Sequence, residues 1–233
     1  MRRLFLLPLL ILAACSSAEK YPYPPQFVAA DAVPARVLGA PPAAHSATYD
    51  KEIRCILARQ ATLDAPERTT IAAEDHITPE MLVTPTLGKR ITPEAYPALY
   101  TLLRHAASDA WRIGDTQQDY WGRTRPWLSD ARVDILVSTI HRPSYPSGHS
   151  TTNHVWAYIL SDLVPARHDA FFDRAYAIGQ HRVEAGVHYP SDVEAGKRLA
   201  GIVYAQMKQT PSFRHEFEAA KRELQRKPLA RKA

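Results

Sequence analysis

The sequence predicts an all-α fold, and three observations support this prediction. Apolar residues recur at helical spacing in one segment after another. No segment shows the sustained alternation of apolar and polar residues, enriched in β-branched types, that is typical of a strand. The 233 residues, 45% of them apolar and 23% charged, suit one globular domain with a buried core. We therefore expect a single-domain helical bundle.

The expected helices follow one another in chain order, each with a start signal or a spacing signal. Proline stands at or near the start of three of them, at Pro93, Pro165 and Pro211. The first N–H groups of a helix have no acceptor within the helix, so the N–H that proline lacks is not needed there. The apolar stripes that define the helices are Ile53, Ile56 and Leu57; Leu99, Leu102, Leu103, Ala106 and Ala110; Val155, Trp156, Ile159, Leu160 and Leu163; Phe171, Phe172, Ala175 and Ile178; Gly196, Leu199, Ala200, Val203 and Met207; and Phe213 and Phe217.

Residues 1–14 are predicted to be a lipoprotein signal peptide. Two arginines precede an apolar run at residues 4–12, which is too short to span a bilayer. Small residues and Cys15 follow, a pattern that resembles the bacterial lipobox, whose cysteine is cleaved and lipidated. An ordinary signal peptide that is cut near Cys15 is the alternative. We expect a periplasmic protein with a lipid anchor on Cys15, and Ser16 indicates sorting to the outer membrane.

Residues 15–47 are predicted to be a tether between this anchor and the domain. They are rich in proline and alanine and show no sustained apolar period. The domain is expected to span residues 48–224, with a basic tail over residues 225–233. The net charge of +5 belongs to the two ends of the chain, so no nucleic-acid partner is predicted. If Cys15 carries lipid, Cys55 has no disulfide partner.

Three polar segments, punctuated by glycine or proline, fall between the expected helices. The first is Arg-Thr-Arg-Pro-Trp at residues 123–127, and the second is Tyr-Pro-Ser-Gly-His-Ser at residues 145–150. The third covers residues 179–192, beginning Gly-Gln-His-Arg and ending Gly-Val-His-Tyr-Pro-Ser-Asp. Because connections on a rigid scaffold commonly carry function, we expect the chemistry to reside here.

Two kinds of group in these segments suit a phosphate ligand. Ser147, Gly148 and His149 occupy a helix start, where free backbone N–H groups and the helix dipole favour an anion. Arg125 and Arg182 are permanent cations whose planar guanidinium groups match phosphate oxygens in a bidentate way. Together they predict an anion site without a bound metal.

Histidines in the same segments suit phosphoryl transfer onto nitrogen. His188 and Asp192 are four residues apart, a spacing that lets a carboxylate fix the tautomer of an imidazole. His149 can donate a proton to a leaving group. No zinc motif occurs, either of the H-E-x-x-H or of the paired-cysteine kind, and no metal or cofactor is predicted.

The three segments resemble the signature of the type-2 phosphatidic acid phosphatase superfamily, which reads K-x6-R-P, P-S-G-H and S-R-x5-H-x3-D. Residues 125–126 match the first part and residues 146–149 the second. Arg182, His188 and Asp192 match the third at the required spacing. Within the superfamily, residues 48–224 are similar to the bacterial class A nonspecific acid phosphatases, which are secreted, soluble and all-α.

The resemblance implies an acid phosphatase that hydrolyses small phosphate monoesters through a phosphohistidine intermediate. His188 is then the nucleophile, Asp192 orients it, and His149 is the acid that protonates the leaving oxygen. Vanadate is expected to inhibit, because the superfamily includes vanadium haloperoxidases with an equivalent anion cage. The phosphate-binding residues implied are Arg125, Arg182, Ser147 and Gly148, with Gln118 at the position of the family lysine.

Two departures from the pattern keep alternatives open. Gln118 replaces the family lysine and His181 replaces the serine before the second arginine, while Arg123 or protonated His181 is a candidate source of the missing charge. A phosphate-binding protein with little turnover is one alternative function. A phosphatase acting on lipid phosphates or pyrophosphates is another, and a vanadium haloperoxidase is a more distant one. Homo-oligomerisation is left open.

Overall fold

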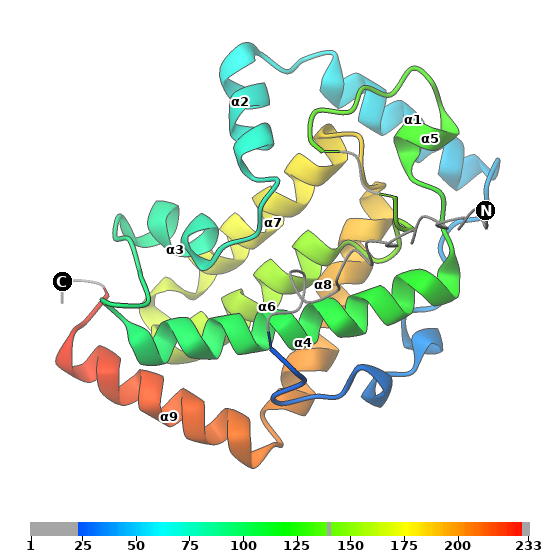
Figure 1. Ribbon diagram of the computed structural model, residues 1–233. Coiled ribbons are helices and arrows are strands. Elements are labelled where there is room, and N and C mark those ends of the chain that lie inside the picture. The colour runs from blue at the N-terminus through cyan, green and yellow to red at the C-terminus, as the bar shows by residue number, and fades with distance from the viewer. Residues whose placement is uncertain (1–22, 139–140, 230–233) are drawn as a thin grey trace, which may run out of the picture.

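The structure is a computed structural model that describes residues 23–138 and 141–229. Every regular element in these ranges is a helix, which confirms the predicted all-α, single-domain fold. Figure 1 shows their arrangement. The elements are η1 (Ala30–Ala32), η2 (Ala35–Leu38), α1 (Ala47–Gln60), α2 (Ala65–Ala73), α3 (Pro79–Leu87), α4 (Pro97–Trp121), α5 (Pro126–Ser129), α6 (Gly148–Leu163), η3 (Pro165–Arg167), α7 (His168–Glu184), α8 (Pro190–Met207) and α9 (Pro211–Arg226).

Helix α6 is the central element and packs against α8, α7 and α4, while α9 lies along α4 (Figure 1). Nearly all residues of α6 are buried, as expected of a helix enclosed on every side. Its Trp156 is 1% exposed and donates its indole N–H to the carbonyl of Leu103 in α4 at 2.7 Å. The start of α6 is therefore held in a fixed place among α4, α7 and α8.

Helix boundaries place the polar segments around the start of α6. Helix α4 ends at Trp121 and is followed by Gly122, whose φ of 60° is in the left-handed region that favours glycine; the first segment follows directly. Ser147 is the N-cap of α6. In the first turn of α8, the carboxylate of Asp192 accepts the N–H of Tyr189 at 2.8 Å. Local capping and turn chemistry thus fix the backbone on which the motif side chains stand.

Residues 23–38 pack on the domain, which corrects the predicted tether over this range. The backbone N–H groups of residues 26–28 all donate to the carboxylate of Asp109 in α4, at 3.0, 2.7 and 3.0 Å. Apolar side chains among the prolines also enter the main core, namely Phe27, Val28, Val33 and Leu38. The packed domain therefore begins by residue 23, not at residue 48.

The end of the chain also packs further than predicted, because Leu229 in the expected basic tail is buried in the main core. The predicted signal peptide, Cys15 and the tether up to residue 22 lie outside the described residues, as do the last four residues of the tail. Within the described ranges, no helix combines the length and apolar content needed to cross a membrane.

Candidate active site

The three polar segments meet at the start of α6. The N–H of Ser147 donates to the carbonyl of Asp192 at 2.9 Å, which joins the second segment to the third. Nη1 of Arg125 donates to the carbonyl of Val187 at 2.8 Å, which joins the first segment to the third. The structure therefore brings together the predicted site residues of all three segments. Those that are at most 5% exposed are Arg125, Ser147, His149, Arg182, His188 and Asp192.

His188 lies between Asp192 and Arg125. Its Nδ1 is 3.5 Å from Oδ2 of Asp192, and its Nε2 is 3.3 Å from Nη1 of Arg125. Because a guanidinium can only donate, Nε2 is the acceptor, which places the ring proton on Nδ1 facing the carboxylate. Burial, and then the charge of Arg125, lower the pKa of His188 to about 4 against the opposing effect of Asp192. The imidazole is therefore neutral in mildly acidic solution, with a lone pair on Nε2.

Arg125 is held by three backbone carbonyls. Besides the bond to Val187, its Nε donates to the carbonyl of Arg142 at 2.7 Å and its Nη2 to that of Pro143 at 3.1 Å. Burial lowers the pKa of Arg125 to about 10, which leaves the side chain charged at any acidic pH. These bonds fix a cation beside Nε2 of His188.

Arg182, in the last turn of α7, is fully buried and only partly bonded. Its Nη2 donates to the carbonyl of Ile71 at 2.6 Å, and its Nη1 is 3.9 Å from Oδ1 of Asp75. Nε and Nη1 have no hydrogen-bond partner among the described residues. Burial lowers the pKa of Arg182, and nearby carboxylates oppose this. Buried donors of this kind are normally satisfied, so these two fit an anionic ligand.

His149, in the first turn of α6, points its Nε2 at the end of α2. Nε2 lies 3.1 Å from the carbonyl of Glu74 and 3.2 Å from that of Asp75, so it carries a proton and donates. Burial, followed by the charge of Arg182, holds the pKa of His149 well below its ordinary value. A proton added to this ring would go to Nδ1, and the two carbonyls favour that charged form.

Ser147 and Gly148 shape the helix start. Oγ of Ser147 accepts the N–H of Ser150 at 3.3 Å, and its own N–H is bonded to Asp192, so this residue is largely engaged within the protein. A Cβ on Gly148 would lie 3.0 Å from the ring of Trp111. The first-turn amides of Gly148 and His149 have no acceptor within the helix, which leaves them suited to an anion.

Gln118 is buried in α4 and contacts the second segment. Its Nε2 donates to the carbonyl of Pro146 at 2.8 Å. The side chain that replaces the family lysine thus supports the loop before α6.

The two candidate sources of the missing charge are both bound by carboxylates. Nη1 of Arg123 donates to Oδ1 of Asp192 at 2.6 Å, and its Nη2 donates to Oε2 of Glu52 at 2.8 Å. Nδ1 of His181 lies 2.7 Å from Oε2 of Glu74. Arg123 and His181 therefore face acidic partners, and neither geometry supports a substitute for the lysine.

Sequence reasoning missed Glu52 and Glu74, which supply these partners. Glu52 shares the buried face of α1 with Tyr49, Ile53 and Ile56. A charged residue on an apolar stripe was the available signal, because buried carboxylates are nearly always paired. Glu74 follows α2 and carries no such signal in its local sequence.

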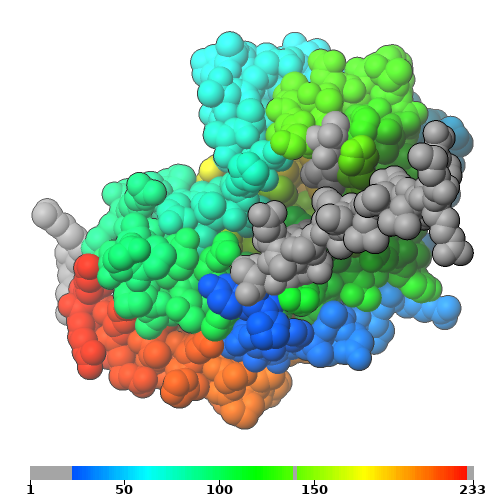
Figure 2. Space-filling view, viewed as in Figure 1, coloured from blue at the N-terminus to red at the C-terminus, as the bar shows by residue number. Residues whose placement is uncertain are grey.

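The site lies beneath α2 and the segment that follows α5. These two parts stand together above the body of the molecule (Figures 1 and 2). The N–H of Ser138 donates to Oδ2 of Asp75 at 3.1 Å, which links them directly. The end of α2 also supplies the carbonyls that bind Arg182 and His149. Helix α2 is therefore part of the wall of the site.

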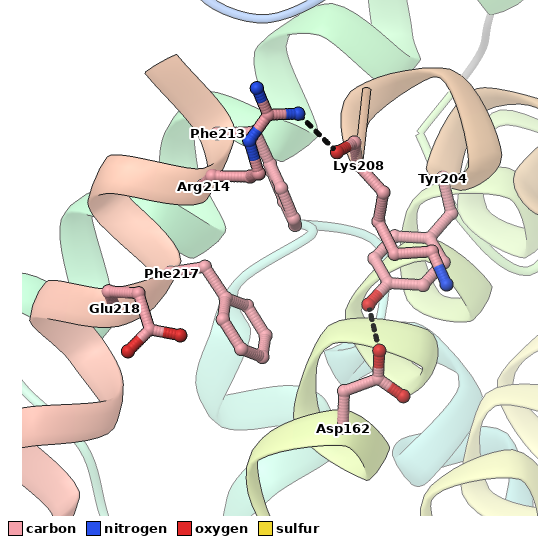
Figure 3. A pocket seen from close by; sticks show the side chains of 7 residues that line it. All are labelled: Asp162, Tyr204, Lys208, Phe213, Arg214, Phe217 and Glu218. Atoms are coloured by element: carbon pink, nitrogen blue, oxygen red, sulfur yellow. Dashed lines mark hydrogen bonds between the residues drawn. The ribbon is translucent and has the colours of Figure 1, made fainter. Parts of the chain in front are cut away.

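A separate pocket of about 250 Å³ lies between α6, α8 and α9 (Figure 3). Tyr204 bonds to Asp162 there at 2.6 Å, and Lys208 lies over the Tyr204 ring. Its lining includes none of the predicted site residues. In the described ranges, no group of three or more histidine, cysteine, aspartate or glutamate side chains is arranged to hold a metal ion.

Comparison with known proteins identifies the family. Residues 99–214 match the model of the PAP2 superfamily, and this span contains all three polar segments. The chain carries a PAP2 superfamily domain. The PAP2 domain resembles a solved structure, the transmembrane PAP2 type phosphatidylglycerolphosphate phosphatase from Bacillus subtilis. The identity is 17%, the TM-score is 0.52, and the match covers 71% of this chain and 87% of that one, which shows a shared fold.

Two curated relatives of this PAP2 chain are named non-specific acid phosphatase. The protein from Salmonella typhi is 27% identical over 233 residues, which covers 95% of this chain and 91% of the relative. The protein from Salmonella typhimurium is 28% identical over 148 residues. That second match covers 61% of this chain and 59% of the relative, less than two thirds of its length.

Proposed function

We propose that this chain is an acid phosphatase that hydrolyses phosphate monoesters through a phosphohistidine on His188. The observation that carries the proposal is the pairing of a neutral Nε2 on His188 with the unpartnered donors of Arg182 in one buried site. The names of the two Salmonella relatives support the same class of reaction.

Binding of the phosphate group uses fixed positive charge. Nε and Nη1 of Arg182, the guanidinium of Arg125 and the first-turn amides of α6 surround the place where a dianion would be held. Both arginines are buried, and their donors are already in position. Such a site stabilises negative charge on the transferring phosphoryl group without reorganisation.

The chemical step is displacement at phosphorus. Nε2 of His188 attacks, the P–N bond forms, and the P–O bond to the alcohol breaks as that oxygen receives a proton. Asp192, facing Nδ1–H, stabilises the positive charge that the ring acquires. Water then attacks the phosphohistidine, which releases inorganic phosphate and restores the neutral ring.

His149 is the proposed proton donor. Its pKa is well below the ordinary value because of burial and the charge of Arg182. A bound phosphate dianion would offset the charge of Arg182 and raise that pKa, so protonation of His149 is expected to accompany substrate binding. The two carbonyls at Nε2 hold the ring while Nδ1 carries the transferable proton.

The test is hydrolysis of p-nitrophenyl phosphate at pH 5–6 by the wild type and by H188A. The matched control is H215A, which changes an exposed histidine in α9. Acid quench of labelled substrate, followed by mapping, should place acid-labile phosphate on His188. We expect turnover in the wild type and the control only. Phosphate on a serine, or phosphate binding without turnover in the wild type, would overturn the proposal. Faster hydrolysis of a lipid-linked phosphate would favour the lipid-phosphatase alternative.

Independence from metal and inhibition by vanadate belong to the same proposal. Arginine and amide donors supply the charge that a metal would otherwise supply, and vanadate can adopt the five-coordinate geometry of the transition state. Activity should persist in a chelator, and vanadate should compete with substrate. Turnover that a chelator abolishes and added metal restores would contradict this part.

We also propose that the protein is periplasmic and anchored to the outer membrane by lipid on Cys15. The leader of two arginines, an apolar run and small residues before Cys15 supports this. The variant C15A should remain unprocessed and should fractionate differently from the wild type. Identical processing and membrane association in both would remove the basis for the anchor.

A further inference from the structure

Asp192 uses its two oxygens for two different partners. Oδ2 accepts the N–H of Tyr189 at 2.8 Å and lies 3.5 Å from Nδ1 of His188. Oδ1 accepts from Nη1 of Arg123 at 2.6 Å. Because the carboxylate is fully buried, its position and its charge depend on these few contacts. Arg123 therefore stands directly behind the pair that contains the nucleophile.

Arg123 is itself held from three sides. Its guanidinium lies 3.8 Å from the centre of the Tyr189 ring, and its Nη1 also donates to Oγ of Ser191 at 2.7 Å. Its Nη2 donates to Oε2 of Glu52 at 2.8 Å. Oε1 of Glu52 accepts the N–H of Ser191 at 2.7 Å, so α1 clamps the first turn of α8 through one carboxylate. These contacts leave Arg123 little freedom to move.

We propose that Arg123 and Glu52 are positioning residues that orient Asp192 toward His188 for the proposed phosphoryl transfer. Arg123 fixes Oδ1 of Asp192 and the N–H of Tyr189 fixes Oδ2, which holds Oδ2 3.5 Å from Nδ1 of the ring. Nδ1 has no hydrogen-bond partner among the described residues, so Oδ2 is the acceptor available to it when the ring becomes cationic. Glu52 fixes Arg123. The inference rests on the proposed function of His188. It adds two residues that the family signature does not include: Arg123, which lies in the first segment but at no signature position, and Glu52, which lies outside all three segments.

The charges of Glu52, Arg123 and Asp192 suit the proposed reaction. Glu52, Arg123 and Asp192 together carry one net negative charge, and they lie behind a ring that becomes cationic when its Nε2 binds phosphorus. A buried ion network is a weak source of stability compared with apolar packing, because each ion loses its hydration. The arrangement is therefore better explained by orientation and charge at the nucleophile.

A role for Arg123 as a direct phosphate ligand predicts a different result. Both of its terminal nitrogens are bonded to carboxylates on the side of Asp192. Loss of a phosphate ligand would raise KM and weaken vanadate inhibition, whereas loss of a positioning residue lowers kcat with KM nearly unchanged. Kinetics can therefore separate the two roles.

The experiment compares R123Q, R123K and E52Q with the control R59Q. Arg59 also joins α1 to a neighbouring helix, through a 3.2 Å ion pair with Glu184, but it does not contact Asp192. For R123Q we expect kcat to fall about 10- to 100-fold, as for other residues that orient a reactive histidine, with KM and vanadate inhibition within about twofold. R123K should recover part of the loss, E52Q should show a smaller loss, and R59Q should match the wild type.

A second readout does not depend on turnover. The imidazole ¹⁵N shifts of His188 should report a proton on Nδ1 in the wild type and in R59Q, and mixed tautomers in R123Q. If the wild type hydrolyses no monoester, the proposed function fails while these shifts still decide the positioning role. Wild-type shifts in R123Q and E52Q, with kcat equal to that of R59Q, would overturn the inference. If R123Q does not fold, R123K and E52Q decide it by the same measurements.

Discussion

In the variant H188N, the free energy of unfolding should decrease less than in the wild type as the pH falls. His188 is 2% exposed, and burial with the charge of Arg125 lowers its pKa from an ordinary 6.5 to about 4. In the unfolded chain the same imidazole regains its ordinary pKa. At a pH between these two pKa values, His188 is therefore protonated in the unfolded state and neutral in the folded state.

The sign and size of the effect follow from this difference. The contribution of His188 is fully present above pH 6.5 and is lost as the pH falls toward 4, because protonation then favours the unfolded state. A difference of about 2.5 pKa units corresponds to about 3 kcal/mol. His154 also has a lowered pKa, but it is present in both proteins and cancels in the comparison. The pKa of His149 is lowered by burial, by Arg182 and partly by the charge of His188, so it rises somewhat in H188N, and the part of the pH dependence that His149 contributes becomes smaller as well. The free-energy gap between wild type and H188N should thus change by about 3 kcal/mol across this range.

Urea unfolding followed by circular dichroism, in steps from pH 7 to pH 4, measures that gap. The buffers must contain no phosphate, because a bound anion would stabilise protonated histidine. The control H215N changes an exposed histidine of α9 and should run parallel to the wild type. If the free energy of unfolding of H188N also changed with pH as that of the wild type does, the conclusion that His188 is buried and neutral with a lowered pKa would be refuted. In the active enzyme, the acid limb of kcat/KM should lie near the same pKa of about 4.

Three further outcomes are expected. The variant Q118K should raise activity or phosphate affinity up to about tenfold, because the neighbouring cations are held by carboxylates and a lysine adds a charge-assisted bond; lower activity would mean that the loop before α6 needs the glutamine amide. The variant H149A should retain more turnover on nitrophenyl phosphate than on an alkyl phosphate, since a good leaving group needs less protonation; equal losses on both substrates would argue against an acid role. In G196A the new methyl would meet the Ser147 carbonyl at 2.6 Å, and urea unfolding should show a loss of about 1–3 kcal/mol; wild-type stability would show that α8 can shift away from α6.

Helices α1, α4, α6, α7, α8 and α9 were predicted from the sequence because their signals are local, whereas the short helices α2 and α3 were not among the expected ones. Apolar spacing, prolines at helix starts and glycine after α4 all act within a few residues. The packing of residues 23–38 was not predictable in this way. It depends on Asp109, more than 80 positions away in the chain, which accepts three consecutive backbone N–H groups. A segment rich in proline resembles a tether until such a distant acceptor is known.

The same distinction between local signals and long-range packing applies to the candidate site. Order and spacing predict that His188, Asp192 and the two arginines lie together, and the structure places them in one buried region. Their roles in catalysis stay a prediction. The choice of partners could not be read from spacing. Arg123 bonds to Glu52 and Asp192, which follows from the way α1 lies over the first turn of α8. Which partners each cation takes is decided by tertiary packing.

The unpartnered donors of Arg182 connect the stability of the site with its function. Nε and Nη1 are buried and have no hydrogen-bond partner among the described residues, and a buried donor left unbonded destabilises a folded state by about 1–3 kcal/mol. An anion that satisfies both donors removes the penalty in the bound state. Under the proposed function, the cost of burying these donors becomes affinity for the phosphoryl group, and it acts most strongly where negative charge is greatest in the reaction.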